Sequence, residues 1–533
     1  MNRRIASGLV ISLLFTGCTK TDKTYRPTSQ ELRLNLHSEP PTLDPRKATD
    51  TVSVSILNLC FEGLTRRTPD GKVIPAVAES FEISPDKKTY TFILRDAKWS
   101  DGKPITAHDF EMTWKTMLDP SFPCEFASDL YIIKNARIAK SNLGSLNEVG
   151  IQAVDDKTLI VQLEHPVPYF LDALATHSFF ATPTHITTTY PNWTDAHYVG
   201  NGNFVLKEWR HRDTILLEKN PQYWDRENIK LERVTFALIE DESTELTMYE
   251  NGELDWAGYP LSNLPTEALP SLEKQGKLHN FAISGTYYYV FNTKEFPFTN
   301  ANIRKAFSLA INRRSIVDNV TQMKQIPAMS LVPPTIWNVT PYFKDNDLAE
   351  ARRLFELGLQ ELGITASDLP PLHLSYNTVV GHHKIAQAIQ EQWHQAFGVQ
   401  VKLENKEWKV FLDELTHHKF QIARMGGLAN VNDPMTFLDY YRYLSNSNNL
   451  AQWSNLKFTQ LLDEADVTLD EAKRFTLLRE AEKVFIDEMP IAPIYFYNGN
   501  YLKKSYVKGI HLSDLNNLDL KWAYVELNDT VSR

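Results

Sequence analysis

The alternation of apolar and polar residues between positions 89 and 118 predicts a strand followed by a helix. Residues 89–95 alternate in the manner of a half-buried strand. Its apolar face consists of Tyr90, Phe92 and Leu94. Downstream, Thr106 and Asp109 have the spacing of a capping box, which predicts that a helix begins there. The buried stripe of that helix consists of Phe110, Trp114 and Leu118.

The same two periodicities recur along the rest of the chain. Strands are predicted at 32–36, 159–163, on both sides of 210–213, and at 234–239, 254–256, 372–376 and 399–403. Helices are predicted at 52–64, from a cap at Ser243 to about Gly252, and at 303–320, 348–362 and 382–397, the last two ending before Gly363 and Gly398. Strands and helices that alternate in two large blocks predict an α/β protein of two lobes.

Composition supports a large protein without a nucleic-acid partner. The 533 residues are 42% hydrophobic, which is enough to bury the cores of two or more domains. The formal net charge of -10 gives no basic surface field, so binding of nucleic acid is not expected.

The N-terminus has the pattern of an export signal over residues 1–17. Arg3 and Arg4 precede an apolar run at 5–15, which is too short for a membrane span of roughly 20 residues. Thr16-Gly17-Cys18 looks like a bacterial lipobox, which implies that Cys18 is lipidated and that 18–30 form a tether. No later segment has the length and apolarity of a span, so we expect a lipid anchor to be the only attachment to a membrane.

Two further cysteines, Cys60 and Cys124, belong to the folded part of the chain. In an oxidising envelope they either form a disulfide or remain buried thiols. Cys60 lies within the apolar run 52–64, and this position favours buried thiols.

The stretch around the first strand and helix resembles a known family. Ala-Glu-Ser at 78–80, Lys-Thr-Tyr-Thr-Phe-x-Leu-Arg at 88–95 and Lys-Trp-Ser-Asp-Gly-x-Pro-x-Thr-Ala-x-Asp-Phe at 98–110 resemble the signature of family five extracellular solute-binding proteins. These proteins include the periplasmic oligopeptide-binding proteins, which are the peptide receptors of ABC importers. Further similarity extends from about Leu32 to the C-terminus.

The resemblance implies the two-lobed periplasmic-binding-protein fold of type II, cluster C, with mixed sheets and three domains. Domain I would consist of 31–61, 185–284 and 499–533, domain II of 62–184, and domain III, the second lobe, of 285–498. Two chain crossings between the lobes would then form a hinge over a cleft.

The implied function is that of a lipid-anchored receptor, not an enzyme. It would capture short peptides in the cleft and deliver them to an ABC importer permease, acting as a monomer without a cofactor at the periplasmic or extracytoplasmic face of a membrane. One alternative is a specialised ligand, such as a cell-wall peptide, a glutathione-like peptide or a metal chelate. Another is an exported hydrolase, but the sequence contains no GxSxG elbow, zinc motif or P-loop.

The segment 420–437 carries the main prediction about the binding site. Phe420, Ile422 and Arg424 fall on one face of a predicted strand, so a guanidinium follows an apolar surface and needs an anion. Gly426 and Gly427 would let another backbone approach closely, as an extended peptide does at a strand edge. A structural ion pair at Arg424 is the alternative.

Three positions depart from the pattern of peptide-binding relatives. Asn430 stands where an aspartate typically holds the ligand's amino terminus, and an amide supplies no compensating charge. Asp433 and Glu39 are possible substitutes for that aspartate. Leu415 and Gly427 replace an arginine and a tryptophan, which predicts a reshaped pocket.

Other predicted ligand-binding residues come from the resemblance or from their position in the chain. They are Ser38, Glu39, Phe126, Tyr288, His382, Trp408 and Tyr497. For each aromatic residue the alternative is a place in the ordinary core. The pairs at 382–383 and 417–418 offer imidazoles to a metal, but adjacent histidines point in different directions, and we expect no metal site.

Overall fold

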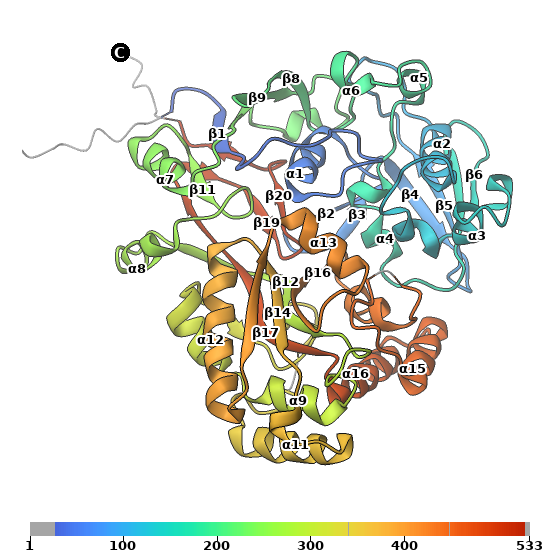
Figure 1. The fold of residues 1–533 in the computed structure, drawn as a ribbon. Coiled ribbons are helices and arrows are strands. Elements are labelled where there is room, and N and C mark those ends of the chain that lie inside the picture. Colours follow the sequence, from blue (N-terminus) through green and yellow to red (C-terminus); the bar gives the residue numbers. More distant parts are fainter. Residues whose placement is uncertain (1–26, 339–340, 447, 528–533) are drawn as a thin grey trace, which may run out of the picture.

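The computed structural model describes residues 27–338, 341–446 and 448–527, which form two lobes with a mixed α/β architecture (Figure 1). The predicted fold class is therefore confirmed. The export signal, Cys18 and the tether as far as residue 26 lie outside the described residues. Within the described part of the chain, no helix is both long and apolar enough to cross a membrane.

The first lobe contains two four-stranded sheets. One has the order β1 (Glu31–Asn35), β10 (Arg233–Ala237), β9 (Thr214–Lys219) and β8 (Phe204–Arg210). The other has the order β4 (Ala78–Ile83), β5 (Thr89–Leu94), β7 (Thr158–Gln162) and β6 (Ile151–Ala153). The inward residues of β1 and β5 belong to one continuous core, so the two sheets share a hydrophobic interior.

The helix after β5 forms as its sequence predicts. α2 (Ala107–Leu118) begins with the capping box of Thr106 and Asp109 and buries its apolar stripe completely. The indole of Trp114 donates a hydrogen bond to the carbonyl of Phe179 at 3.1 Å. Nearby, α1 (Thr51–Cys60) ends earlier than predicted, because Phe61 adopts an extended conformation. Cys60 and Cys124 are confirmed as buried free thiols, and burial raises the pKa of Cys60 to about 12.

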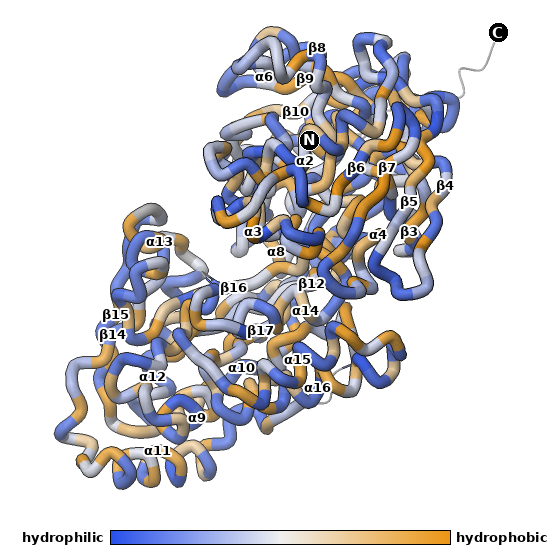
Figure 2. Tube along the Cα trace, turned by 90° about the vertical axis from the view of Figure 1, so that its right-hand side faces the viewer, coloured by the Kyte–Doolittle hydropathy of each residue, from blue (hydrophilic) through white to orange (hydrophobic). Residues whose placement is uncertain are grey.

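The second lobe is built on most of a seven-stranded sheet with helices on both faces (Figure 2). Its main order is β11 (Trp256–Gly258), β17 (Ile491–Lys503), β12 (His279–Phe291), β16 (Ile422–Leu428), β14 (Leu372–Asn377) and β15 (Val401–Lys406). The edge strand β11 reaches the first lobe, where its Trp256 packs in the core of that lobe (Figure 1). One core packs this sheet against α9 (Ala301–Leu309), α11 (Leu348–Leu362) and α12 (Val380–Phe397). The other core packs it against α13 (Trp408–Thr416), α15 (Leu456–Val467) and α16 (Glu471–Glu488).

Further boundaries differ from the predictions, of which the following are examples. The helix predicted at 303–320 is divided after Leu309, because Arg313 is completely buried and donates hydrogen bonds to carbonyls of Ser308 and Pro493. α7 (Glu242–Asn251) is capped by Asp241 and not by Ser243. The strand predicted at 254–256 is β11, which begins only at Trp256.

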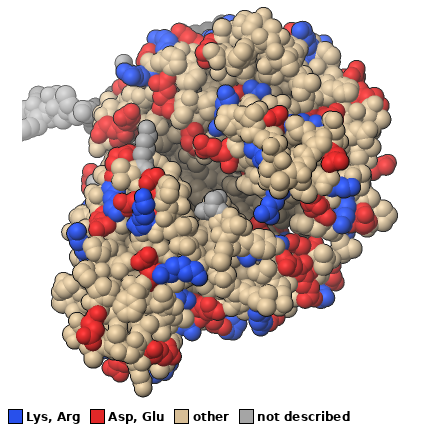
Figure 3. Space-filling view, turned by 45° about the vertical axis from the view of Figure 1, so that its right-hand side comes forward, with Lys and Arg blue, Asp and Glu red and all other residues tan. Residues whose placement is uncertain are grey.

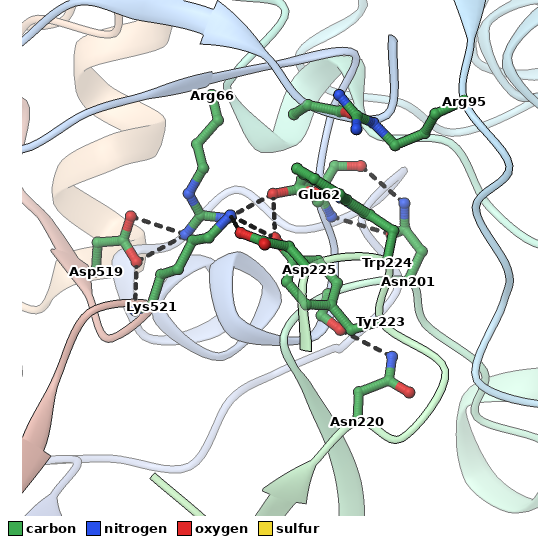
Figure 4. Close-up of polar contacts among 12 residues, drawn as sticks. Glu62, Arg66, Arg95, Asn201, Asn220, Tyr223, Trp224, Asp225, Asp519 and Lys521 are labelled. Atoms are coloured by element: carbon green, nitrogen blue, oxygen red, sulfur yellow. Dashed lines mark hydrogen bonds and ion pairs between the residues drawn. The ribbon is translucent and has the colours of Figure 1, made fainter. Parts of the chain in front are cut away.

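A network of ionic and aromatic groups joins three distant segments in the first lobe (Figure 4). Arg66 donates to Glu62 at 2.7 Å and to both oxygens of Asp519 at 2.7 and 2.8 Å. Glu62 also accepts hydrogen bonds from Tyr223 and Trp224, at 2.7 and 2.6 Å. The network therefore attaches the C-terminal segment to the body of the lobe.

The buried carboxyl of Glu482 predicts a pH-dependent stability of the second lobe. It accepts hydrogen bonds from the backbone N–H groups of Leu331 and Val332 and from the hydroxyl of Tyr342. Burial raises the pKa of Glu482 to about 7. Because the folded-state pKa lies above the unfolded value, this group's contribution is fully present below about pH 4.5 and is lost as the pH rises through 7.

We expect Glu482→Gln to remove this dependence, since glutamine keeps the shape and can accept from the same backbone groups. Relative to the variant, the wild-type protein should lose up to about 3 kcal/mol in free energy of unfolding between pH 5 and pH 8.5. Urea unfolding of both proteins across that range measures the difference. A constant difference between the two proteins would show that Glu482 does not titrate there.

Candidate ligand-binding site

The space between the lobes is the candidate site. Figure 3 shows a deep hollow between them. In Figures 1 and 2, β12, β16 and β17 reach the junction of the lobes, and α13 lies at the end of the second lobe nearest the first. A ligand in this hollow would contact both lobes.

β16 presents an open edge at this junction. Along its whole length it pairs with β12, but its parallel pairing with β14 includes only Ile422 and Ala423. The N–H of Ala429 donates to Ser284 and that of Asn292 donates to the carbonyl of Gln421, so the odd-numbered residues of β16 are the ones bonded to β12. The main-chain groups of Arg424, Gly426 and Leu428 therefore point toward the unpaired edge, where an extended peptide could add as a further strand.

Arg424 is a cation without a counter-ion in the described structure. Its guanidinium lies 4.9 Å from the ring centre of Tyr287, donates to the hydroxyl of Tyr497 at 3.2 Å and lies 3.5 Å from the amide oxygen of Asn377. Its Nε is buried and has no hydrogen-bond partner among the described residues. No carboxylate of the described residues is ion-paired with Arg424, so the alternative of a structural ion pair is not present there.

His382 and the start of α12 add to this anion-favouring environment. The Nδ1 of His382 lies 3.3 Å from the hydroxyl of Tyr287. Burial, and secondarily the charge of Arg424, lower the pKa of His382 to about 3, so the ring is neutral at physiological pH. Val379 precedes α12 and supplies no side-chain cap, which leaves the positive end of the helix dipole available to an anion.

The glycines of β16 have different neighbours from those expected. A Cβ on Gly426 would lie 2.2 Å from the hydroxyl oxygen of Tyr497, so this glycine is needed for the tyrosine of the same chain to cross the strand. A Cβ on Gly427 would meet Phe437 at 3.4 Å. The absence of a Cβ at Gly426 therefore leaves the space that the hydroxyl of Tyr497 occupies beside Arg424. This role is separate from any role in admitting a ligand backbone.

The other aromatic residues that were predicted to bind the ligand differ in how deeply they are buried. Tyr288 is almost fully buried on the face of β12 that packs against α13 and α16. Trp408 is 47% exposed at the start of α13, where Leu412, one turn later, is also exposed. Phe420 lies before β16 and packs in the core opposite that of Ile422, so the predicted shared face is wrong for Phe420.

The residues near the end of β16 narrow the choice of groups that could hold the amino terminus of a bound peptide. Asn430 is exposed, and its N–H donates to Thr436. Asp433 cannot substitute for an aspartate there, because both of its oxygens bind Arg474, at 2.7 and 2.9 Å. Leu415 is buried in the core, so it does not reshape the pocket directly.

The predicted residues of the first lobe are not brought together with Arg424 by any contact in the described structure. Glu39 pairs with His211 on the β8–β9 turn, and the hydroxyl of Ser38 lies 3.5 Å from Nε2 of His37. Phe126 is partly buried, 5.3 Å from the ring of His177. Glu39 is therefore already paired and is a poor substitute for an amine-binding aspartate.

The paired histidines do not converge. His382 faces Tyr287, whereas Nδ1 of His383 lies 2.6 Å from the hydroxyl of Tyr376. Among the described residues no group of three or more histidine, cysteine, aspartate or glutamate side chains could hold a metal ion.

Three residues around Arg424 were not predicted from the sequence: Tyr287, Asn377 and Tyr495. Tyr287 and Asn377 contact Arg424, and Tyr495 stacks on Tyr287. No local pattern identifies them, because strand pairing brings them to Arg424. A contact between the lobes was not predicted either, in which the N–H of Asn432 donates to Asp172 at 3.1 Å.

Two lobes around a hollow, a strand edge open toward it and an arginine without a counter-ion define a solute-binding protein of the two-lobed class. Comparison with known proteins identifies the family. The model for bacterial extracellular solute-binding proteins, family 5, matches residues 72–449, and the chain belongs to this family.

Relatives resemble the chain over nearly its whole length. It is 45% identical to the oligopeptide-binding protein OppA of Bacillus subtilis, covering 96% of this chain and 95% of that protein. It is 38% identical to the dipeptide-binding protein DppE of the same organism, covering 97% and 98% of the two chains. The crystal structure of Haemophilus influenzae OppA in complex with the peptide RPPGFSPFR matches with a TM-score of 0.81 and 31% identity, covering 94% of this chain and 100% of that one.

Proposed function

We propose that this protein captures short peptides between its lobes and delivers them to the permease of an ABC importer. The observation that carries the proposal is the open edge of β16 next to the uncompensated charge of Arg424. Main-chain hydrogen bonds along the edge would hold peptides of many sequences, and the guanidinium would receive a carboxylate. The names of the relatives, which include oligopeptide- and dipeptide-binding proteins, support this ligand class.

We further infer that the protein is held at the outer face of a membrane by a lipid on Cys18 and that its lobes move about a hinge. β12 and β17 run side by side between the lobes, and their pairing shifts register between Ala282 and Thr286. This irregularity supports chain crossings near the boundaries expected at 284–285 and 498–499. Closure around a peptide would be the state that the permease recognises.

Calorimetric titration tests the proposed ligand class. The protein is unfolded and refolded to remove bound ligand, and is then titrated with peptides of two to six residues and with free amino acids as the control. We expect micromolar or tighter binding of several unrelated peptides and none of the single amino acids. Absence of binding to every peptide would contradict the proposal and would favour a specialised ligand, identified by mass spectrometry of the native protein.

A further inference from the structure

The loop that follows β16 belongs to the second lobe but packs into the first. Val431, shortly after the end of the strand, is 8% exposed and lies among the buried residues of the first-lobe core. Next to it, the N–H of Asn432 donates to Oδ2 of Asp172 at 3.1 Å. Asp172 belongs to α4 (Phe170–Ala173) of the first lobe, which lies at the junction of the lobes in Figure 2.

The first lobe makes the reciprocal contact just before α4. Tyr169 packs against the cores of both lobes. On the same segment, Nε2 of His165 lies 3.9 Å from Oδ2 of Asp466 in α15, whose side chain is 11% exposed. Each lobe therefore places an apolar side chain against the core of the other. We use the term interlobe contact for the set Tyr169, Asp172, Val431 and Asn432.

The second-lobe part of the interlobe contact is firmly attached to its own lobe. Asp433 is 4% exposed, and its two oxygens accept hydrogen bonds from Arg474 of α16 at 2.7 and 2.9 Å. The loop is thus held between β16 at one end and α16 at the other. Because both elements belong to the second lobe, Val431 moves with that lobe.

The first-lobe part is attached in the same way. Phe170 is completely buried in the first-lobe core, and its ring centre lies 4.8 Å from that of Tyr90 on β5. Asp172 is paired with Arg67, and the two side chains are 14% and 13% exposed. Tyr169 therefore moves with the first lobe. Separation of the lobes at this point would withdraw Tyr169 and Val431 from the opposite cores and expose their apolar surface to water.

We propose that Tyr169 and Val431 are positioning residues for ligand binding, which stabilise the arrangement of the lobes in which both border the hollow beside the β16 edge. The interlobe contact consists of protein groups alone, so it favours this arrangement before a ligand arrives. The apparent affinity of a ligand is proportional to the fraction of the protein in the binding-competent arrangement. The expected effect on peptide affinity rests on the proposed function, whereas the effect on the ligand-free protein does not.

The test removes the interlobe contact from each side in turn. Tyr169→Ala acts from the first lobe and Val431→Ser from the second. The matched controls are Tyr190→Ala and Val154→Ser, which alter side chains of residues that are 40% and 54% exposed. Small-angle X-ray scattering measures the radius of gyration of each protein without ligand and with saturating peptide. Calorimetric titration with tetra-alanine and tetra-serine measures the affinity for two peptides with the same termini and different side chains.

We expect both variants to have a larger radius of gyration than the wild type when no ligand is present, and saturating peptide to restore the wild-type value. Tyr169→Ala should weaken binding of both peptides by the same factor, about 3- to 30-fold. Val431→Ser should give a smaller common factor, because valine buries less apolar surface than tyrosine. Neither control should change the radius or the affinities.

An unchanged radius in both ligand-free variants would overturn the inference, because the interlobe contact would then not hold the lobes. Unchanged affinities would overturn it as well, and so would a loss confined to one peptide, since Tyr169 would then contact the ligand directly. Circular dichroism shows that each variant is folded, and Val431→Ser keeps the test available if Tyr169→Ala does not fold. The ligand-free scattering needs no peptide, so it distinguishes failure of this inference from failure of the proposed function.

Discussion

Replacing Arg424 with glutamine is expected to weaken peptide binding by about 30- to 1,000-fold, or about 2–4 kcal/mol. The guanidinium is largely enclosed by Tyr287, Tyr497 and Asn377, and the described structure offers it no carboxylate. A ligand carboxylate would complete a charge-assisted interaction in a poorly solvated place, where its loss costs most. Glutamine retains polarity and can bond Tyr497 but carries no charge.

The measurement is calorimetric titration of wild type and variant with alanine peptides of two to five residues, as free acids and as C-terminal amides. Arg424→Gln should weaken binding of the acids strongly and of the amides little, because amidation has already removed the anion. Arg424→Lys should have an intermediate effect, since it keeps the charge without the planar fork. Equal losses for acids and amides would show that Arg424 shapes the pocket without binding the carboxylate.

Arg424→Gln should weaken peptide binding but should not destabilise the ligand-free protein. A desolvated cation without a counter-ion disfavours the folded state. We therefore expect the ligand-free Arg424→Gln protein to unfold at the same temperature as the wild type or at a higher one. Differential scanning calorimetry distinguishes this outcome from general damage to the fold.

Elements with strong local signals could be predicted from sequence, whereas long-range packing could not. α11 matches its predicted bounds because an amphipathic stripe ends at Gly363, which adopts the left-handed conformation. The helix predicted at 303–320 is divided after Leu309, because Arg313 is drawn into the core by carbonyls that include one from Pro493, far away in the chain. No periodicity contains that information.

The candidate binding site likewise contains one residue that sequence could predict and others that it could not. Arg424 was recognisable because a charge interrupts an apolar alternation, and such a charge needs a partner wherever the strand lies. The tyrosines around it depend on the register of β12, β16 and β17, which sequence patterns do not specify.

The largest expected loss of stability follows from Arg66→Met in the ionic network of the first lobe. Arg66, Glu62 and Asp519 have side chains that are 10%, 2% and 20% exposed, so the variant leaves two carboxylates in a largely buried place without their cation. Lys521 does not replace it, since its ammonium group is engaged by Asp225 at 2.7 Å. We expect a loss of about 3–5 kcal/mol in free energy of unfolding, the usual consequence of removing one partner from a buried ion pair.

Urea unfolding followed by circular dichroism measures this loss, and Arg226→Met is the matched control. Arg226 also pairs with a glutamate, Glu227, but both side chains are more than half exposed, so its removal should cost less than about 1 kcal/mol. Arg66→Met/Asp519→Leu should recover part of the stability, because it removes one of the orphaned charges together with the cation. If Arg66→Met costs no more than the control, the ion pairs of Arg66 with Glu62 and Asp519 do not contribute to stability, and the C-terminal segment is held to the first lobe by its other contacts, which include the ion pair of Lys521 with Asp225 (Figure 4).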